Sequence, residues 1–193
     1  MPVNEILQFR KQASHVSNMS LMLAMHCAPL LKGRKIANIF TVDRTDFAGI
    51  EELLAGTLIR YRFLKTSKNR VILFLYRRER LHGYLTTPEV SAFLRKLGYQ
   101  TRDFGMMMNH LSSRMTLYSD GSAEFPHEIG LFLGYPLSDV LGFLDGRQCE
   151  MIGYWKVYDH AQSKLRLFNR YDELRDQAVK EVLNGKSIRE IAV

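Results

Sequence analysis

Three side chains of this 193-residue sequence could together perform nucleophilic or acid–base chemistry: Cys27, His127 and Glu128. A catalytic thiol needs a base within hydrogen-bond distance, and His127 is the suitable remote partner because His26 would leave a helix on a different face. Cys27 stands near the end of a predicted helix, where the macrodipole opposes thiolate formation, and free cysteines are mostly buried. The sequence therefore favours an inert Cys27 and leaves an enzyme with a Cys27/His127/Glu128 cleft as an alternative.

His127 and Glu128 also suggest a metal site, since imidazole and carboxylate groups are common ligands. Adjacent helical positions point about 100° apart, and the His-Glu-x-x-His spacing is broken because Leu131 occupies the last position. We expect Glu128 to be a helix-start charge and His127 to be a hydrogen-bonded structural residue. With six scattered histidines and no Cys-x-x-Cys motif, the sequence predicts no metal site and no cofactor.

Methionines form two groups in the sequence. They are Met19, Met22 and Met25, and then Met106, Met107, Met108 and Met115. Together with His26, Cys27 and His110, they make metal or haem handling through His, Cys and Met residues a further alternative. The first group has helical spacing, which is typical of core residues, so core packing is the favoured interpretation.

Basic residues are the best candidates for ligand binding. Between residues 60 and 80, eight basic side chains are opposed only by Glu79, in a chain with a formal net charge of +7. Outside that segment, Trp155, Lys156 and Tyr158 could line a pocket beside the apolar stretch 125–144, although an aromatic strand is more often part of a core. The candidate ligand-binding residues are Arg60, Arg62, Arg77, Arg78 and Lys156. They predict a non-catalytic binding or accessory protein for an anionic small molecule or a protein partner. Nucleic-acid binding through segment 60–80 is an alternative, although no RNA-binding consensus, phosphate loop or complete helix-turn-helix is recognisable.

Four segments have the composition of β-strands, namely 35–42, 57–65, 71–76 and 152–158. Segment 57–65 alternates apolar and basic residues, whereas segment 71–76 is apolar on both faces, as a central strand would be. We expect one mixed α+β domain over residues 1–193, with a three- or four-stranded sheet covered by helices.

Helices are predicted over 14–31, 43–54, 79–97, 102–115 and 165–183, with the third split at Pro88. Ser187 and Glu190 form a capping box that predicts a short helix at the end of a C-terminal helical segment. The stretch 125–144, FPHEIGLFLGYPLSDVLGFL, contains two prolines that can start helical turns and a central Gly134 that can stop one. It predicts a tight helical hairpin with an apolar second arm.

The sequence predicts a cytoplasmic protein with no membrane association. The longest apolar stretch, MSLMLAMHCAPLL, is interrupted by His26 and Pro29 and is too short to span a bilayer. It is also a poor secretory signal. Cys27 and Cys149 are far apart in the sequence and cannot form a disulfide framework, which fits a reducing compartment.

Three motifs occur in a fixed order: HCAP at 26–29, FPHEIGLFLGYPL followed by DV in 125–140, and GYWKVY at 153–158. On these motifs the chain resembles a bacterial family of uncharacterised proteins that is known only as a domain of unknown function. The resemblance spans most of the chain and implies one compact cytosolic domain. It implies no particular activity, cofactor or catalytic residue.

Overall fold

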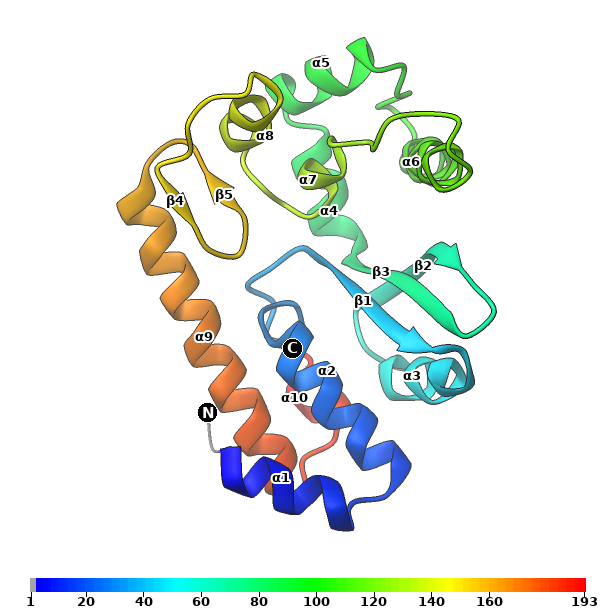
Figure 1. Cartoon of the computed structure of the whole chain (residues 1–193), viewed down its shortest axis with the longest axis vertical. Helices are drawn as coiled ribbons and strands as arrows, with labels where there is room; N and C mark the ends of the chain where they lie inside the picture. The colour runs from blue at the N-terminus through cyan, green and yellow to red at the C-terminus, as the bar shows by residue number, and fades with distance from the viewer. Residues whose placement is uncertain (1–2) are drawn as a thin grey trace.

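A computed structural model of the chain describes residues 3–193 and contains a three-stranded antiparallel sheet (Figure 1). The strands are β1 (Ala37–Asp43), β2 (Ile59–Thr66) and β3 (Arg70–Arg77), in the spatial order β1-β3-β2. Each of the first three predicted strands lies within two residues of an observed one. β3 is central, as its apolar residues on both faces predicted. The prediction of a mixed α+β fold around a three-stranded sheet is confirmed.

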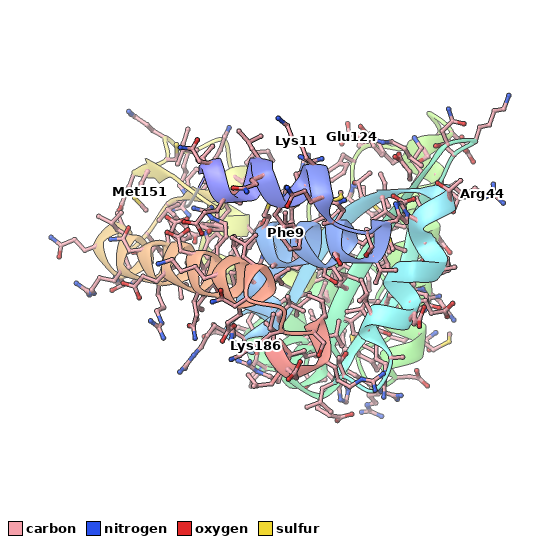
Figure 2. The ribbon with its side chains drawn as sticks, turned by 90° about the horizontal axis from the view of Figure 1, so that it is seen from below. Phe9, Lys11, Arg44, Glu124, Met151 and Lys186 are labelled. Atoms are coloured by element: carbon pink, nitrogen blue, oxygen red, sulfur yellow. The ribbon has the colours of Figure 1, made fainter. Side chains whose placement is uncertain are left out.

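One face of the sheet carries Leu73 and Leu75 and is covered by helices from both ends of the chain. These helices are α1 (Val3–Gln12), α2 (His15–Leu31), α3 (Phe47–Leu54, preceded by the 3-10 turn Arg44–Asp46), α9 (Ala161–Leu183) and α10 (Ile188–Ile191). Seen from below, α1 lies across this layer with Lys11 pointing outward, while Phe9 packs against the core (Figure 2). The predicted capping box of α10 is confirmed.

The opposite face carries Phe74 and is covered by helices from the middle of the chain. These helices are α4 (Arg78–Leu85), α5 (Pro88–Lys96), α6 (Phe104–Ser119), α7 (Ile129–Phe132) and α8 (Leu137–Leu144). The predicted break at Pro88 is observed between α4 and α5. Because neighbouring residues of β3 point to opposite faces, this single strand contributes to both cores.

The predicted helical hairpin is observed with a shorter first arm. Residues 126–128 form a turn, α7 contains only four residues, and Pro136 directly precedes α8. Gly134 joins the two arms with φ of +80°, and a Cβ atom at this position would lie 2.7 Å from Ile36. This close approach holds the hairpin against the segment that leads into β1.

The predicted strand 152–158 is not part of the main sheet. It folds into a separate two-stranded hairpin of β4 (Met151–Ile152) and β5 (Lys156–Val157), with a turn in which the Gly153 amide donates to the Trp155 carbonyl at 3.0 Å. Trp155 and Val157 form a third apolar cluster with Phe168 of α9. The aromatic residues of this segment therefore pack against a helix instead of extending the sheet.

Arg77 links the end of the central strand to the end of α2. Its side chain is only 6% exposed, and Nε and Nη2 donate hydrogen bonds to the carbonyls of Leu30 and Leu31 at 3.0 and 2.8 Å. A cation at this place opposes the negative end of the helix dipole. The guanidinium group therefore acts as a C-terminal cap for α2.

Replacing Arg77 with Met should lower the free energy of unfolding by about 2 kcal/mol, because it removes two hydrogen bonds from a charged donor. Arg78→Met is the matched control, since Arg78 is exposed and lies over the Phe104 ring at 5.6 Å. We expect this control to change stability by about 1 kcal/mol or less. Urea unfolding of both variants provides the measurement, and equal effects would contradict the capping role.

Candidate functional site

A pocket of about 340 Å³ lies between β1, the α7–α8 hairpin and β5. Its lining is mainly apolar and aromatic and comes from segments that are far apart in the sequence. The lining residues are Ile39, Phe125, His127, Ile129, Gly130, Leu133, Tyr135, Asp139, Val140, Phe143, Trp155 and Lys156. The volume and lining are typical of small-molecule sites, which are mostly apolar clefts of roughly 300–1,000 Å³ with a few polar groups.

A row of ring contacts forms one wall of the pocket. The His127 ring lies between those of Phe125 and Phe143, with centroids 5.2 and 4.8 Å apart. Phe143 is 40% exposed, and the Nζ of Lys156 lies 5.4 Å from its ring centroid. His127 and Lys156, both named by the sequence, therefore flank one exposed aromatic ring, and they supply the polar groups of this wall.

Asp139 fixes the part of the lining that contains Trp155 and Tyr135. Its carboxylate is buried and accepts hydrogen bonds from Trp155 Nε1 and from the Tyr158 amide, each at 2.8 Å. Lys164 Nζ lies 3.8 Å from the same carboxylate. These contacts hold the Trp155 ring in a stack on Tyr135, with centroids 4.7 Å apart and planes 22° apart. Asp139 was not predicted, although a lone carboxylate in the apolar stretch LSDVLGFL was a usable signal.

Glu128 is adjacent to His127 in sequence but serves a different part of the structure. Its buried carboxylate accepts hydrogen bonds from the Tyr99 hydroxyl at 2.8 Å and from the Arg114 guanidinium. Glu128 also helps raise the pKa of Tyr99, for which burial is the main cause. The pocket that His127 lines does not include Glu128. This carboxylate joins α6 to the start of α7.

Cys27 lies in the core on the α2 side of the sheet, with no exposed surface. Burial raises the pKa of its thiol to about 11, while a hydrogen bond from Asn38 Nδ2 at 3.3 Å and the nearby Lys35 oppose this shift. The pocket lined by His127 does not reach Cys27. The structure therefore does not bring Cys27, His127 and Glu128 together in this pocket.

The basic residues named by the sequence are dispersed. Arg62 donates from Nε to Ser112 Oγ at 2.9 Å and also contacts Asn109 on α6, whereas Arg60 is exposed. Arg77 caps α2, and Arg78 lies over an aromatic ring. Of the five candidate cations, only Lys156 lines the pocket.

Lys35 is a buried cation that sequence reasoning missed. Its Nζ donates to Asn38 Oδ1 at 2.8 Å and lies 5.9 Å from the ring centroid of Tyr135, on the pocket wall. Burial lowers the pKa of Lys35 to about 8, against a smaller opposing effect of Cys27. Buried Lys35 and Cys27 and half-buried Asn38 form a polar cluster that adjoins the pocket residue Tyr135.

The methionines are largely core residues: Met19, Met107, Met108 and Met115 are buried. Within residues 3–193, no group of three or more His, Cys, Asp or Glu side chains is placed to hold a metal ion. No helix in the same part of the chain is both long and apolar enough to cross a bilayer.

The fold and the site define a small α+β protein with an aromatic-walled pocket between a sheet edge and a helical hairpin. The chain belongs to the family described as "Protein of unknown function (DUF3793)", whose model matches residues 23–192. Neither the curated proteins nor the solved structures contain a match to this chain. The family resemblance read from the three motifs is therefore confirmed.

The two cysteines should differ sharply in reactivity. With a pKa of about 11, Cys27 is a thiolate in roughly one molecule in a thousand at about pH 8, and it is fully buried, whereas Cys149 is only half-buried. An aromatic disulfide reagent should modify one thiol in the native protein and two after denaturation. Cys149→Ser should abolish the native reaction, and a rapid native reaction of Cys27 would contradict this assignment.

The buried Lys35 should make stability depend on pH. Its pKa is about 8 in the folded chain and near the ordinary 10.5 after unfolding, so the unfolded state binds more protons as pH rises above about 8. This group should therefore raise the free energy of unfolding by about 1 kcal/mol between about pH 8 and 9. Above about pH 9, the raised pKa of Cys27 acts in the opposite direction.

Lys35→Met isolates this effect below about pH 9, because the difference in unfolding free energy between wild type and variant cancels every titration that does not depend on Lys35. We expect the free energy of unfolding of the wild type to rise relative to that of the variant between about pH 8 and 9. Urea unfolding at each pH provides the measurement. Lys68→Met, at an exposed position, is the control and should show a constant difference. A constant difference for Lys35→Met would show that its ammonium group is not desolvated.

Proposed function

We propose that this chain is a non-catalytic binding protein whose pocket takes an apolar or aromatic group joined to an anionic group. The observation that carries the proposal is the aromatic-walled pocket of about 340 Å³ with Lys156 beside Phe143. The aromatic walls suit an apolar body, and the exposed ammonium group suits a carboxylate. The free cysteines Cys27 and Cys149 fit a cytoplasmic location.

The hydrogen-bonding of the buried carboxylates supports a binding function over a catalytic one. The Asp139 carboxylate is occupied by two donors at 2.8 Å, and Glu128 by Tyr99 and Arg114. A general base needs a partner that orients it and a reacting group within reach. His127 has aromatic neighbours on both sides, which suits a packing role in the wall.

Trp155 is the only tryptophan of the chain and lines the pocket, so its fluorescence reports directly on occupancy. The probes are 4-phenylbutyrate and its uncharged amide. We expect the carboxylate to bind roughly three- to tenfold more tightly than the amide, because Lys156 adds one partly exposed charge interaction. Titration calorimetry on the same pair provides an independent measurement.

Lys156→Met should remove the preference for the carboxylate and leave amide binding unchanged. Lys65→Met is the matched control, since it removes an exposed cation outside this pocket, and it should keep the preference. Phe143→Ala should weaken both probes. Failure of both probes to change Trp155 fluorescence or to release heat would refute the proposed function.

A further inference from the structure

The outer edge of β1 is open. β1 is an end strand of the sheet and pairs only with β3 (Figure 1). Just beyond its two ends, the Arg77 amide donates to the Ile36 carbonyl and the Arg44 amide donates to the Asn69 carbonyl, each at 2.9 Å. In an antiparallel ladder, alternate residues bond to the neighbouring strand, so the even-numbered residues of β1 face β3. Its odd-numbered residues direct their N–H and C=O groups away from the sheet.

Ile39 and Thr41 are the odd-numbered residues in the middle of β1. Within residues 3–193, no backbone or side-chain group hydrogen-bonds to their outward amides and carbonyls. Such a row of unpaired groups is a template for an additional strand. Two consecutive outward-facing residues offer two donors and two acceptors, spaced as another polypeptide backbone requires.

The two edges of the sheet differ in how they discourage strand addition. β2 has a register irregularity between Phe63 and Lys65, and Arg60, Arg62 and Lys65 place cations along it. A bulge and basic side chains are the usual means of blocking an edge. β1 has a regular register, no proline and no charged residue before Asp43.

The open edge adjoins the pocket. Ile39 lines the pocket and is 36% exposed, although it is an apolar strand residue. Side chains alternate between faces, so a strand added beside Ile39 and Thr41 would direct every second side chain toward the pocket face. Lys156 and His127, at the same pocket, would meet the side chains two positions before and after such an anchor, which share its face.

We propose that β1 binds an extended segment of a partner protein, which adds a fourth strand at the Ile39–Thr41 edge and inserts one apolar or aromatic side chain into the pocket. The segment carries an acidic residue two positions from the anchor, on the same face of the added strand, where it meets Lys156. This inference rests on the proposed function, since the anchor and its acidic neighbour together are the apolar and anionic ligand. Charge complementarity with a chain of net charge +7 favours an acidic segment.

A second copy of this chain fits the site less well than an acidic partner. Self-pairing through β1 would offer only Ala37, Ile39, Thr41 or Asp43 as alternate side chains, and none of these is aromatic. It would also bring together two molecules of the same positive charge.

The probes are acetylated and amidated seven-residue peptides of Thr and Val, with Glu at the second and sixth positions and Phe, Leu or Ala at the centre, so that the acidic and central side chains share one face. We expect the Phe peptide to bind roughly tenfold more tightly than the Ala peptide, because only the former fills the pocket. Trp155 fluorescence measures the affinity. Hydrogen exchange by NMR should show that the Ile39 and Thr41 amides become protected, which a ligand confined to the pocket would not cause.

N-methylation of the peptide tests the strand pairing without changing the protein. Methyl groups on one alternate set of amides should weaken binding roughly tenfold or more, while methyl groups on the other set should have little effect. In the protein, Thr41→Pro removes an outward amide and leaves the bonds between β1 and β3 intact, so it should weaken the peptide and not 4-phenylbutyrate. Thr41→Val keeps the amide and is the control.

The outcomes separate this inference from the proposed function. If 4-phenylbutyrate binds and no peptide does, or if both sets of methyl groups act equally, strand addition is wrong and the pocket proposal stands. If neither 4-phenylbutyrate nor any peptide binds, both the strand-addition inference and the proposed function are wrong. A concentration-dependent dimer in light scattering that Thr41→Pro dissociates would make a second copy the occupant and overturn the partner assignment.

Discussion

β3 is buried on both faces, and the rest of the fold follows from this constraint. Leu73 and Leu75 point into one core and Phe74 into the other, each with no exposed surface. Because side chains alternate along a strand, such a segment needs a packed layer on each side. Helices from the two ends of the chain form one layer, and helices from its middle form the other. The pocket lies where β1 meets the second layer.

The buried carboxylates of this fold hold helices and strands in place. Their hydrogen bonds go to groups of the protein itself. Asp139 connects α8 to the β4–β5 hairpin through Trp155 and Tyr158, and Glu128 connects α7 to α6 through Arg114. A buried charge is costly unless several donors satisfy it, so these bonds also explain why the carboxylates can lie inside. The pocket surface that remains available to a ligand is mainly aromatic and aliphatic.

Local signals were enough to predict the main sheet, the break at Pro88 and the capping box of Ser187 and Glu190, because each depends on a few adjacent residues. For segment 152–158, local signals predicted a strand of the main sheet, and it forms a separate hairpin instead. Aromatic alternation there looks the same whether the neighbour is a strand or a helix, and the deciding contact is with Phe168 of α9. A Cβ at Gly153 would lie 2.3 Å from that ring, which shows how closely the turn approaches the helix.

The candidate site was predictable only in part for the same reason. His127 and Lys156 stood out by residue type, whereas Ile39, Tyr135 and Asp139 become pocket residues only when three distant segments meet. Sequence reasoning named Lys156 as a residue that could line a pocket with Trp155, and the structure places it at the pocket beside Phe143. For the four arginines, charge identified the cations but not the groups that they contact, because those contacts form only in the tertiary fold.

The exposed apolar surface and the unpaired backbone of β1 have a common explanation. Ile39 and Phe143 both line the pocket at 36% and 40% exposure, and the backbone groups of Ile39 face outward beside them. A small apolar molecule would cover the two side chains and leave the backbone groups in water. An extended polypeptide would cover the side chains and also satisfy the donors and acceptors, so one kind of ligand accounts for both features.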